Sequence, residues 1–180
     1  RRFTVQAAAD LVQRSRTTLY RAEEEGVVVP ESGPKPGKYS LEQVNKLREH
    51  CGSSPRRKEC DPCLKIAIQS FKGGVAKSVT TVHLAQYLAL KGYRVLVADF
   101  DPQASATSAF GYLPDRDFGK DDTLLPYILG KKRDLQYCII DTYYAGISLI
   151  PCCLPFYDAE YQLAFASARS KTEVERKGYF

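Results

Sequence analysis

The sequence contains no methionine and no long apolar run, and each absence excludes something. No stretch approaches the roughly eighteen apolar residues that a membrane span needs, and the basic N-terminus lacks the apolar core of a signal peptide. We therefore expect no membrane contact and a cytoplasmic location. Because the chain starts at Arg1 and none of its 180 residues is Met, we expect it not to be a whole translation product. Its 44% content of hydrophobic residues is ordinary for a globular protein and excludes a disordered tail.

Cysteine is present six times, but in spacings that favour free thiols over a metal site. Cys60 and Cys63 have the spacing of zinc ligands. The other close pair, Cys152 and Cys153, is adjacent and poorly suited to chelating one ion. A four-cysteine zinc site is the alternative to thiols that are packed or lie in a linker.

Basic charge is concentrated in the N-terminal third of the chain. Residues 1–60 carry twelve Lys and Arg against eight Asp and Glu, whereas residues 61–180 carry fourteen against thirteen. The polar stretch 53–63 contains two prolines and the basic run Arg56 to Lys58, as is typical of a hinge. The sequence therefore predicts a domain at 1–52, a linker at 53–63 and a second domain at 64–180.

The first domain has the pattern of short helices joined by tight turns. Helical spacing covers 3–12 and 16–25, with a break at 13–15. The sequence Ser40-Leu41-Glu42-Gln43 is a capping box that predicts a helix over 41–50. Two short helices with a turn between them indicate a helix-turn-helix, whose second helix enters the major groove of DNA. A small helical adaptor with a charged face is the alternative.

Three segments of this domain, F-T-x-x-x-A-A, S-R-T-T-L-Y-R-A-E-E-E-G and G-K-Y-S-L-E-Q-V, resemble a MerR-type winged helix-turn-helix. The resemblance implies that the second helix and a wing containing Lys35 and Lys38 contact DNA. Arginine, lysine, threonine and tyrosine are residue types that bind phosphates and base edges. The DNA-binding candidates are Arg14, Arg16, Thr17, Thr18, Tyr20, Arg21 and Lys38.

The stretch Phe71 to Ser78 joins an apolar run at 64–69 to a helical segment, which predicts a strand, a phosphate loop and a helix. The usual G-x-x-x-x-G-K-[ST] template fails because Phe71 and Ala76 replace its glycines, but x-K-G-G-x-x-K-[ST] fits. In such a loop the amides curl around phosphate oxygens, Lys77 lies on the β- and γ-phosphates, and Ser78 holds Mg²⁺. A lysine-rich surface turn is the alternative. The ATP-binding candidates are Lys72, Gly73, Gly74, Val75, Ala76, Lys77, Ser78 and Val79.

A second segment, K-G-Y-R-V-L-V-A-D-F-D-P-Q-A-S at 91–105, predicts a strand at 94–99 that ends in two carboxylates, Asp99 and Asp101. A strand, a helix at 78–91 and another strand indicate a right-handed parallel crossover. Carboxylates at this position are suited to holding Mg²⁺ through water, for which Asp99 is the candidate, and to orienting an attacking water on the γ-phosphate. The alternative is a solvated strand end and a turn residue.

Together the two motifs resemble the ParA/MinD family of ATPases, with its deviant phosphate loop and D-x-D-P-Q signature. The resemblance implies ATP and Mg²⁺ as cofactors, a catalytic role for Lys72, Lys77 and Asp101, and a homodimer formed on ATP binding, in which Lys72 reaches the partner's phosphates. It also implies DNA and a ParB-type protein as partners. The predicted fold is an α/β P-loop NTPase-type parallel sheet, apparently truncated, preceded by a small winged helix-turn-helix domain.

The segment 137–151 has two interpretations. Tyr137 to Thr142 has the form of a Walker B strand ending in a magnesium-binding aspartate, Asp141. However, the T-Y-x-x-G-I-x-L-I-P pattern at 142–151 resembles a plasmid ParA and RepA segment that precedes Walker B. The second interpretation is favoured; it makes 147–150 the third strand and Asp141 an ordinary helix-end residue.

Two functions follow from these patterns. The resemblance implies a plasmid or chromosome partition ATPase of the ParA/RepA type. The alternative is a truncated, catalytically silent DNA-binding regulator, whose Walker B strand would be missing.

Overall fold

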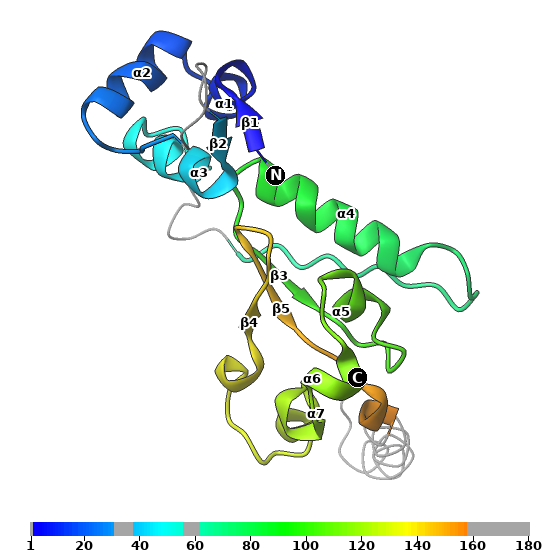
Figure 1. Cartoon of the computed structure of the whole chain (residues 1–180). Helices are drawn as coiled ribbons and strands as arrows, with labels where there is room; N and C mark the ends of the chain where they lie inside the picture. Colours follow the sequence, from blue (N-terminus) through cyan, green and yellow to red (C-terminus); the bar gives the residue numbers. More distant parts are fainter. Residues whose placement is uncertain (1, 31–37, 56–61, 158–180) are drawn as a thin grey trace. The chain divides into compact units, whose positions relative to one another are not determined.

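The computed structural model describes residues 2–30, 38–55 and 62–157. These form two compact units, one of the described residues up to 95 with 144–147, and one of residues 96–143 with 148–157. The first unit contains β1 (Arg2–Thr4), α1 (Val5–Val12), α2 (Arg16–Glu24), β2 (Lys38–Ser40), α3 (Leu41–His50) and α4 (Lys77–Leu90) (Figure 1). The second contains α5 (Ser105–Ala109), α6 (Pro114–Asp117), α7 (Leu125–Ile128), β4 (Ile140–Asp141) and short 3₁₀ turns. The strands β3 (Val95–Ala98) and β5 (Ile147–Ile150) begin in the first unit and continue in the second.

The N-terminal helices begin where polar side chains cap them. Thr4 accepts a hydrogen bond from the amide of Ala7 at the start of α1, and Ser15 accepts one from Thr18 at the start of α2. Ser40 and Gln43 form the predicted capping box of α3. The first helix begins later than predicted, because residues 2–4 pair with β2 as an antiparallel strand. The break at 13–15 is confirmed: Gln13 has a left-handed φ of 59° and ends α1.

These elements enclose one apolar core. Its buried members come from α1, α2, α3 and the strand pair, and they include Val12, Leu19, Tyr39, Val44 and Leu47, each 0% exposed. Leu19 and Ala22 face inward as the helical spacing predicted. The winged helix-turn-helix assignment of this region stays a prediction.

A buried tyrosine gives this core a pH dependence that can be measured. The hydroxyl of Tyr39 donates a hydrogen bond to the carboxylate of Glu23, and burial, then this carboxylate, raises the pKa of Tyr39 well above its usual value. The folded state thus favours the neutral phenol. The contribution of this phenol to the free energy of unfolding is fully present below pH 10 and is lost as the pH rises beyond it. We expect Tyr39→Phe to lower the free energy of unfolding by about 1–2 kcal/mol at pH 7.5, and by less at pH 10.5.

Urea denaturation at both pH values measures this difference. The exposed Tyr87, on α4, provides the control, since Tyr87→Phe leaves the free energy of unfolding unchanged if only the buried phenol matters. An equal loss at both pH values for Tyr39→Phe would show that its titration is not linked to folding.

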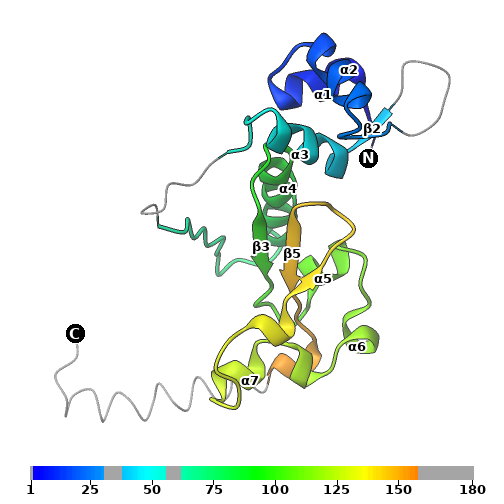
Figure 2. The same ribbon diagram turned by 90° about the vertical axis from the view of Figure 1, so that its left-hand side faces the viewer.

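The sheet is mixed and has the order β3-β5-β4. Figure 2 shows β3 beside β5. The amide of Val95 donates to Gly146 (2.9 Å) and that of Asp99 donates to Ile150 (3.1 Å). The two partners advance together along both strands, so β3 and β5 are parallel. The predicted α/β class with a parallel pair and a third strand at 147–150 is therefore confirmed. The short strand β4 is antiparallel to β5.

The predicted strand at 64–69 is wrong. These residues form no strand, and Leu64 and Ile66 are 81% and 54% exposed. An apolar run becomes a strand only when a neighbour takes its backbone hydrogen bonds, and no described segment does so here. The helix after the phosphate loop is confirmed within one residue at each end, at Lys77–Leu90. Among the described residues, no helix combines the length and apolarity that crossing a membrane requires.

Candidate functional site

The predicted phosphate loop leads directly into α4, the longest described helix. Residues 71–76 are exposed, and Lys77 and Ser78, the first two residues of α4, are half-buried. No side chain caps this helix start. The first amides of a helix lack partners within it and carry partial positive charge, so this end of α4 can receive an anion.

The loop backbone bends through two left-handed residues. Gly74 has a φ of 73° and Ala76, the N-cap of α4, has a φ of 59°. Ala76 stands where the usual template has glycine, and a left-handed alanine costs about 1–2 kcal/mol. A Cβ added to Gly73 or Gly74 would meet no atom within 4 Å, so a ligand can approach this backbone closely.

The two lysines of the motif are in contact. The Nζ atom of Lys77 lies 3.5 Å from the carbonyl oxygen of Lys72, so the Lys77 side chain folds back across the loop. The amide of Lys72 in turn donates to the hydroxyl of Ser70 (3.2 Å). The ammonium group is thereby held over the backbone that would surround a phosphate.

The two signature carboxylates belong to the second compact unit and differ in surroundings. Asp99 is 6% exposed, and its oxygens accept hydrogen bonds from the amide (2.8 Å) and hydroxyl (2.7 Å) of Thr107 and from the amide of Asp101 (3.2 Å). Asp101 is half-buried and accepts one from the amide of Gln103 (3.0 Å). Asp99 is therefore anchored by Thr107 of α5 and by the loop that follows it, and Asp101 is held in a turn.

Asp141 is neither a helix-end residue nor placed like a Walker B aspartate. It ends β4 and is paired with Ser148, in the first half of β5. The amide of Asp99, by contrast, bonds to Ile150 at the carboxyl end of β5. Because β4 runs antiparallel to β5, Asp141 lies toward the edge of the sheet opposite to Asp99.

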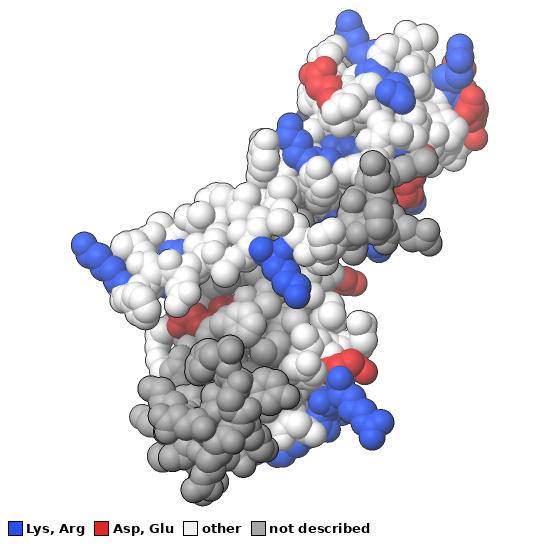
Figure 3. All heavy atoms as spheres, turned by 180° about the vertical axis from the view of Figure 1, so that it is seen from behind, with Lys and Arg blue, Asp and Glu red and all other residues white. Residues whose placement is uncertain are grey.

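The DNA-binding candidates are mostly exposed, but the side chain of one of them, Arg14, is hydrogen-bonded within the protein. Arg14 donates to the carbonyl oxygens of Gln13 (3.0 Å) and Cys51 (2.9 Å) and so stabilises the ends of α1 and α3. The side chains of Arg16, Arg21 and Lys38 are exposed and form no hydrogen bond or ion pair with another described residue. In the part of Figure 3 that holds α1 to α3, basic side chains are separated from one another and acidic ones lie among them. Lys35 lies outside the described residues.

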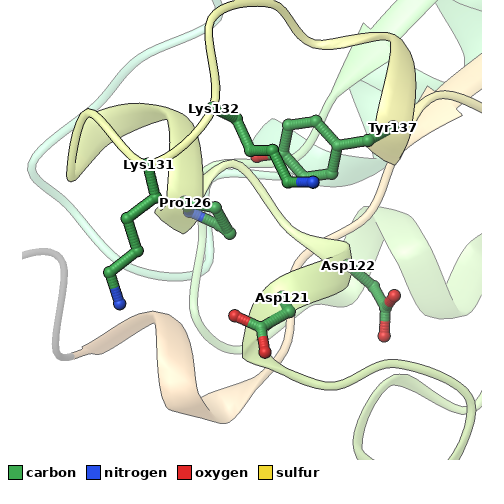
Figure 4. A pocket seen from close by; sticks show the side chains of 6 residues that line it. All are labelled: Asp121, Asp122, Pro126, Lys131, Lys132 and Tyr137. Atoms are coloured by element: carbon green, nitrogen blue, oxygen red, sulfur yellow. The ribbon is translucent and has the colours of Figure 1, made fainter.

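A separate cavity of about 430 Å³ lies in the second unit, and none of the predicted site residues lines it. Figure 4 shows Lys132 extended across the ring of Tyr137, with Asp121 and Asp122 on the other side of the cavity. Its two lysines and two aspartates balance in charge, so the cavity does not select an ion of either sign.

The cysteines that the structure describes are free thiols. Cys138, Cys152 and Cys153 are buried, and burial raises the pKa of Cys152 to about 12. This thiol is therefore protonated at neutral pH and is a poor metal ligand. No cluster of potential metal ligands occurs among the described residues, and Cys60 lies outside them.

The sequence pattern does not indicate that two residues, Thr107 and Arg48, are buried and form several hydrogen bonds. Thr107, 0% exposed, binds the Asp99 carboxylate. Arg48, 2% exposed, donates to the backbone of α1 and α4. Neither belongs to a motif, and an arginine in a polar helix is ordinarily expected at the surface.

Comparison with known proteins gives relatives for both parts of the chain. A family described as "AAA domain" (AAA_31) matches residues 64–177. Protein SopA of Escherichia coli strain K12 is 39% identical over 170 residues, which cover 91% of this chain and 44% of SopA. The chromosome-partitioning ATPase Soj of Thermus thermophilus is 50% identical over 117 residues, covering 64% of this chain and 42% of Soj.

A solved structure, cobyrinic acid a,c-diamide synthase from Mycobacterium smegmatis with bound ATP analog and magnesium, is 30% identical. The match covers 53% of this chain and 37% of that one, with a TM-score of 0.48. This chain spans less than half the length of SopA and Soj. The family match and the identity to these partition proteins show that the chain belongs to the AAA-domain family of ParA-type partition ATPases.

Proposed function

We propose that this chain belongs to a plasmid or chromosome partition protein that uses Mg-ATP binding and hydrolysis to switch its dimerisation and DNA association. The observation that carries the proposal is the contact of Lys77 with Lys72 across a loop of exposed backbone at the uncapped start of α4. Positive charge, open glycine backbone and unpartnered amides are what a triphosphate requires.

Each loop residue has a role in this proposal. The amides from Gly73 to Lys77 bind phosphate oxygens, the ammonium of Lys77 neutralises the β- and γ-phosphates, and the hydroxyl of Ser78 is a magnesium ligand. Magnesium, when bound, compensates the charge that develops on the phosphates. Lys72, exposed beside the glycines, is free to reach the nucleotide of a second copy in an ATP-bound homodimer.

Asp101 is proposed to orient the water that attacks the γ-phosphate. Its carboxylate is held by a turn and is half-exposed, so one oxygen remains available for water. Asp99 is proposed to assist through a water of the magnesium shell. Phosphoryl transfer needs mainly positioning and charge compensation, which these few groups can supply.

The N-terminal helices are proposed to add sequence-specific DNA binding, with α2 entering the major groove. The exposed Arg16, Arg21 and Lys38 support phosphate contacts, and Thr17 and Tyr20 are exposed on the same helix as the two arginines. A ParB-type protein is the proposed partner and the cytoplasm the proposed location. Arg14 is proposed to act indirectly, by holding the turn before α2 in place.

A second candidate function is a DNA-binding regulator that does not turn over ATP. It is favoured by the exposed, unpaired run at 64–69 and by the position of Asp141, which does not supply a Walker B carboxylate. In this case nucleotide is bound but not hydrolysed.

Replacement of Asp101 by asparagine tests the proposal. We expect Asp101→Asn to bind Mg-ATP like the unchanged chain, and to lower DNA-stimulated phosphate release by about a hundredfold. Asp134 provides a matched control, since it accepts a hydrogen bond from the amide two residues on (3.0 Å) in the same way as Asp101, and Asp134→Asn should leave turnover unchanged. Binding without turnover in the unchanged chain would favour the regulator, and absence of Mg-ATP binding would overturn both functions.

A further inference from the structure

Thr107 connects three segments of the second compact unit through one buried hydroxyl. Its Oγ1 donates to Oδ2 of Asp99 (2.7 Å) and accepts from the amide of Cys152 (3.1 Å), and its own amide donates to the same Asp99 oxygen (2.8 Å). Thr107 belongs to α5, Asp99 follows β3 and Cys152 follows β5. The hydroxyl proton points to Asp99, because the amide of Cys152 can only donate to Oγ1, whereas the Asp99 carboxylate accepts.

The same hydrogen bonds continue to the proposed water-orienting residue. The second oxygen of Asp99, Oδ1, accepts from the amide of Asp101 (3.2 Å), and the carboxylate of Asp101 accepts from the amide of Gln103 (3.0 Å). Thr107 therefore fixes Asp99, Asp99 fixes the backbone of Asp101, and that backbone fixes the Asp101 side chain. Thr107 is 0% exposed and cannot itself touch nucleotide or bulk water.

We propose that Thr107 is a positioning residue for ATP hydrolysis, which sets the direction of the Asp101 carboxylate through Asp99. The inference rests on the proposed function. Hydrolysis forms a bond from the water oxygen to the γ-phosphorus and breaks the bond from that phosphorus to the bridging oxygen, whose electron pair leaves with ADP. The protons of the water pass to the released phosphate and to solvent. A displacement of about 1 Å at the residue that orients the water can cost a hundredfold in rate, so a buried anchor behind Asp101 matters for kcat.

Three variants test this assignment. Thr107→Val keeps the shape but removes the hydroxyl, and Thr107→Ser restores it. Thr123→Val is the matched control, because Thr123 is likewise 0% exposed, in the same unit, donates to the carbonyl of Lys120 (2.9 Å) and accepts from the amide of Leu125 (3.2 Å). Each valine variant loses a hydroxyl that donates one hydrogen bond and accepts another, but only the hydroxyl of Thr107 contacts Asp99.

Amide hydrogen exchange in the nucleotide-free chain is the first readout. The amides of Asp101 and Gln103 should exchange about tenfold faster in Thr107→Val and unchanged in Thr123→Val and Thr107→Ser. The second readout is DNA-stimulated phosphate release: Thr107→Val should lower kcat at least about tenfold with KM for Mg-ATP within about twofold, and Thr107→Ser should recover it.

Equal exchange at Asp101 and Gln103 in the two valine variants, or equal kcat, would overturn the inference, since Thr107 would then only contribute stability. If the unchanged chain binds no Mg-ATP, the proposed function fails by itself. The exchange comparison still decides whether Thr107 holds Asp101 in place.

Discussion

Replacement of Lys77 by alanine is expected to lower the affinity for Mg-ATP by about a hundredfold or more, which corresponds to about 3 kcal/mol. Lys77 is the first residue of α4, and its ammonium lies over the loop, 3.5 Å from the carbonyl of Lys72. A triphosphate in this loop would replace that weak contact by charge-assisted hydrogen bonds. Removal of the ammonium leaves the backbone amides and the helix end, which bind a highly charged anion far less well.

Equilibrium titration with a fluorescent ATP analogue, with and without Mg²⁺, measures this loss. Lys91 provides the control, because it lies at the opposite end of α4, 5.4 Å from the ring centre of Tyr87. Lys91→Ala removes the same charge from the same helix and should bind nucleotide normally. Undiminished affinity in Lys77→Ala would place the nucleotide elsewhere, whatever the family of the chain.

Features of the fold that are encoded by neighbouring residues could be predicted from the sequence. The capping box at Ser40, the turn at Gln13 and the start of α4 each involve only residues within a few positions of one another. The strand at 147–150 is predicted by the resemblance of residues 142–151 to a segment of plasmid ParA and RepA proteins, and it is present. The phosphate loop and the two carboxylates could be found for the same reason: the chemistry requires fixed residue types at fixed spacing.

Features that depend on distant partners could not be predicted. The run at 64–69 has the composition of a strand, but composition does not supply the neighbour that its backbone needs. The pairing of Asp141 with Ser148 depends on how the chain returns after β4. Thr107 lies eight residues after Asp99, and their contact requires the turn between them.

Arg48 carries the second large prediction, because it is a buried cation whose hydrogen bonds go to uncharged oxygens. It is 2% exposed and donates to the carbonyl of Leu11 (3.1 Å), the amide oxygen of Asn45 (2.7 Å) and the carbonyl of Leu90 (2.5 Å). Burial lowers the pKa of its guanidinium. A Cβ on Gly92 would lie 3.2 Å from this side chain, so a glycine there makes room for it.

We expect Arg48→Met to lower the free energy of unfolding by about 3 kcal/mol, although methionine fills much of the same volume. The substitution leaves the partly buried oxygens of Leu11, Asn45 and Leu90 without this donor, and each unsatisfied group costs about 1 kcal/mol. Leu90 ends α4, where the unpaired carbonyls of a helix favour a cation. Urea denaturation followed by circular dichroism measures the change, and Lys46→Met, exposed on the same helix, is the control.

The size of the destabilisation does not show whether Arg48 couples α4 to the N-terminal helices, but the pattern of unfolding does. Arg48 joins α1 and α3 to the end of α4, and Leu90 also packs against the N-terminal core. The amides of α3 and α4 should therefore lose exchange protection at one urea concentration in the unchanged chain and at two in Arg48→Met. If Arg48→Met is destabilised but the amides of α3 and α4 still lose exchange protection at the same urea concentration, apolar packing, including that of Leu90, is enough to couple α4 to the N-terminal helices. The guanidinium would then only satisfy backbone carbonyls that the fold has already buried.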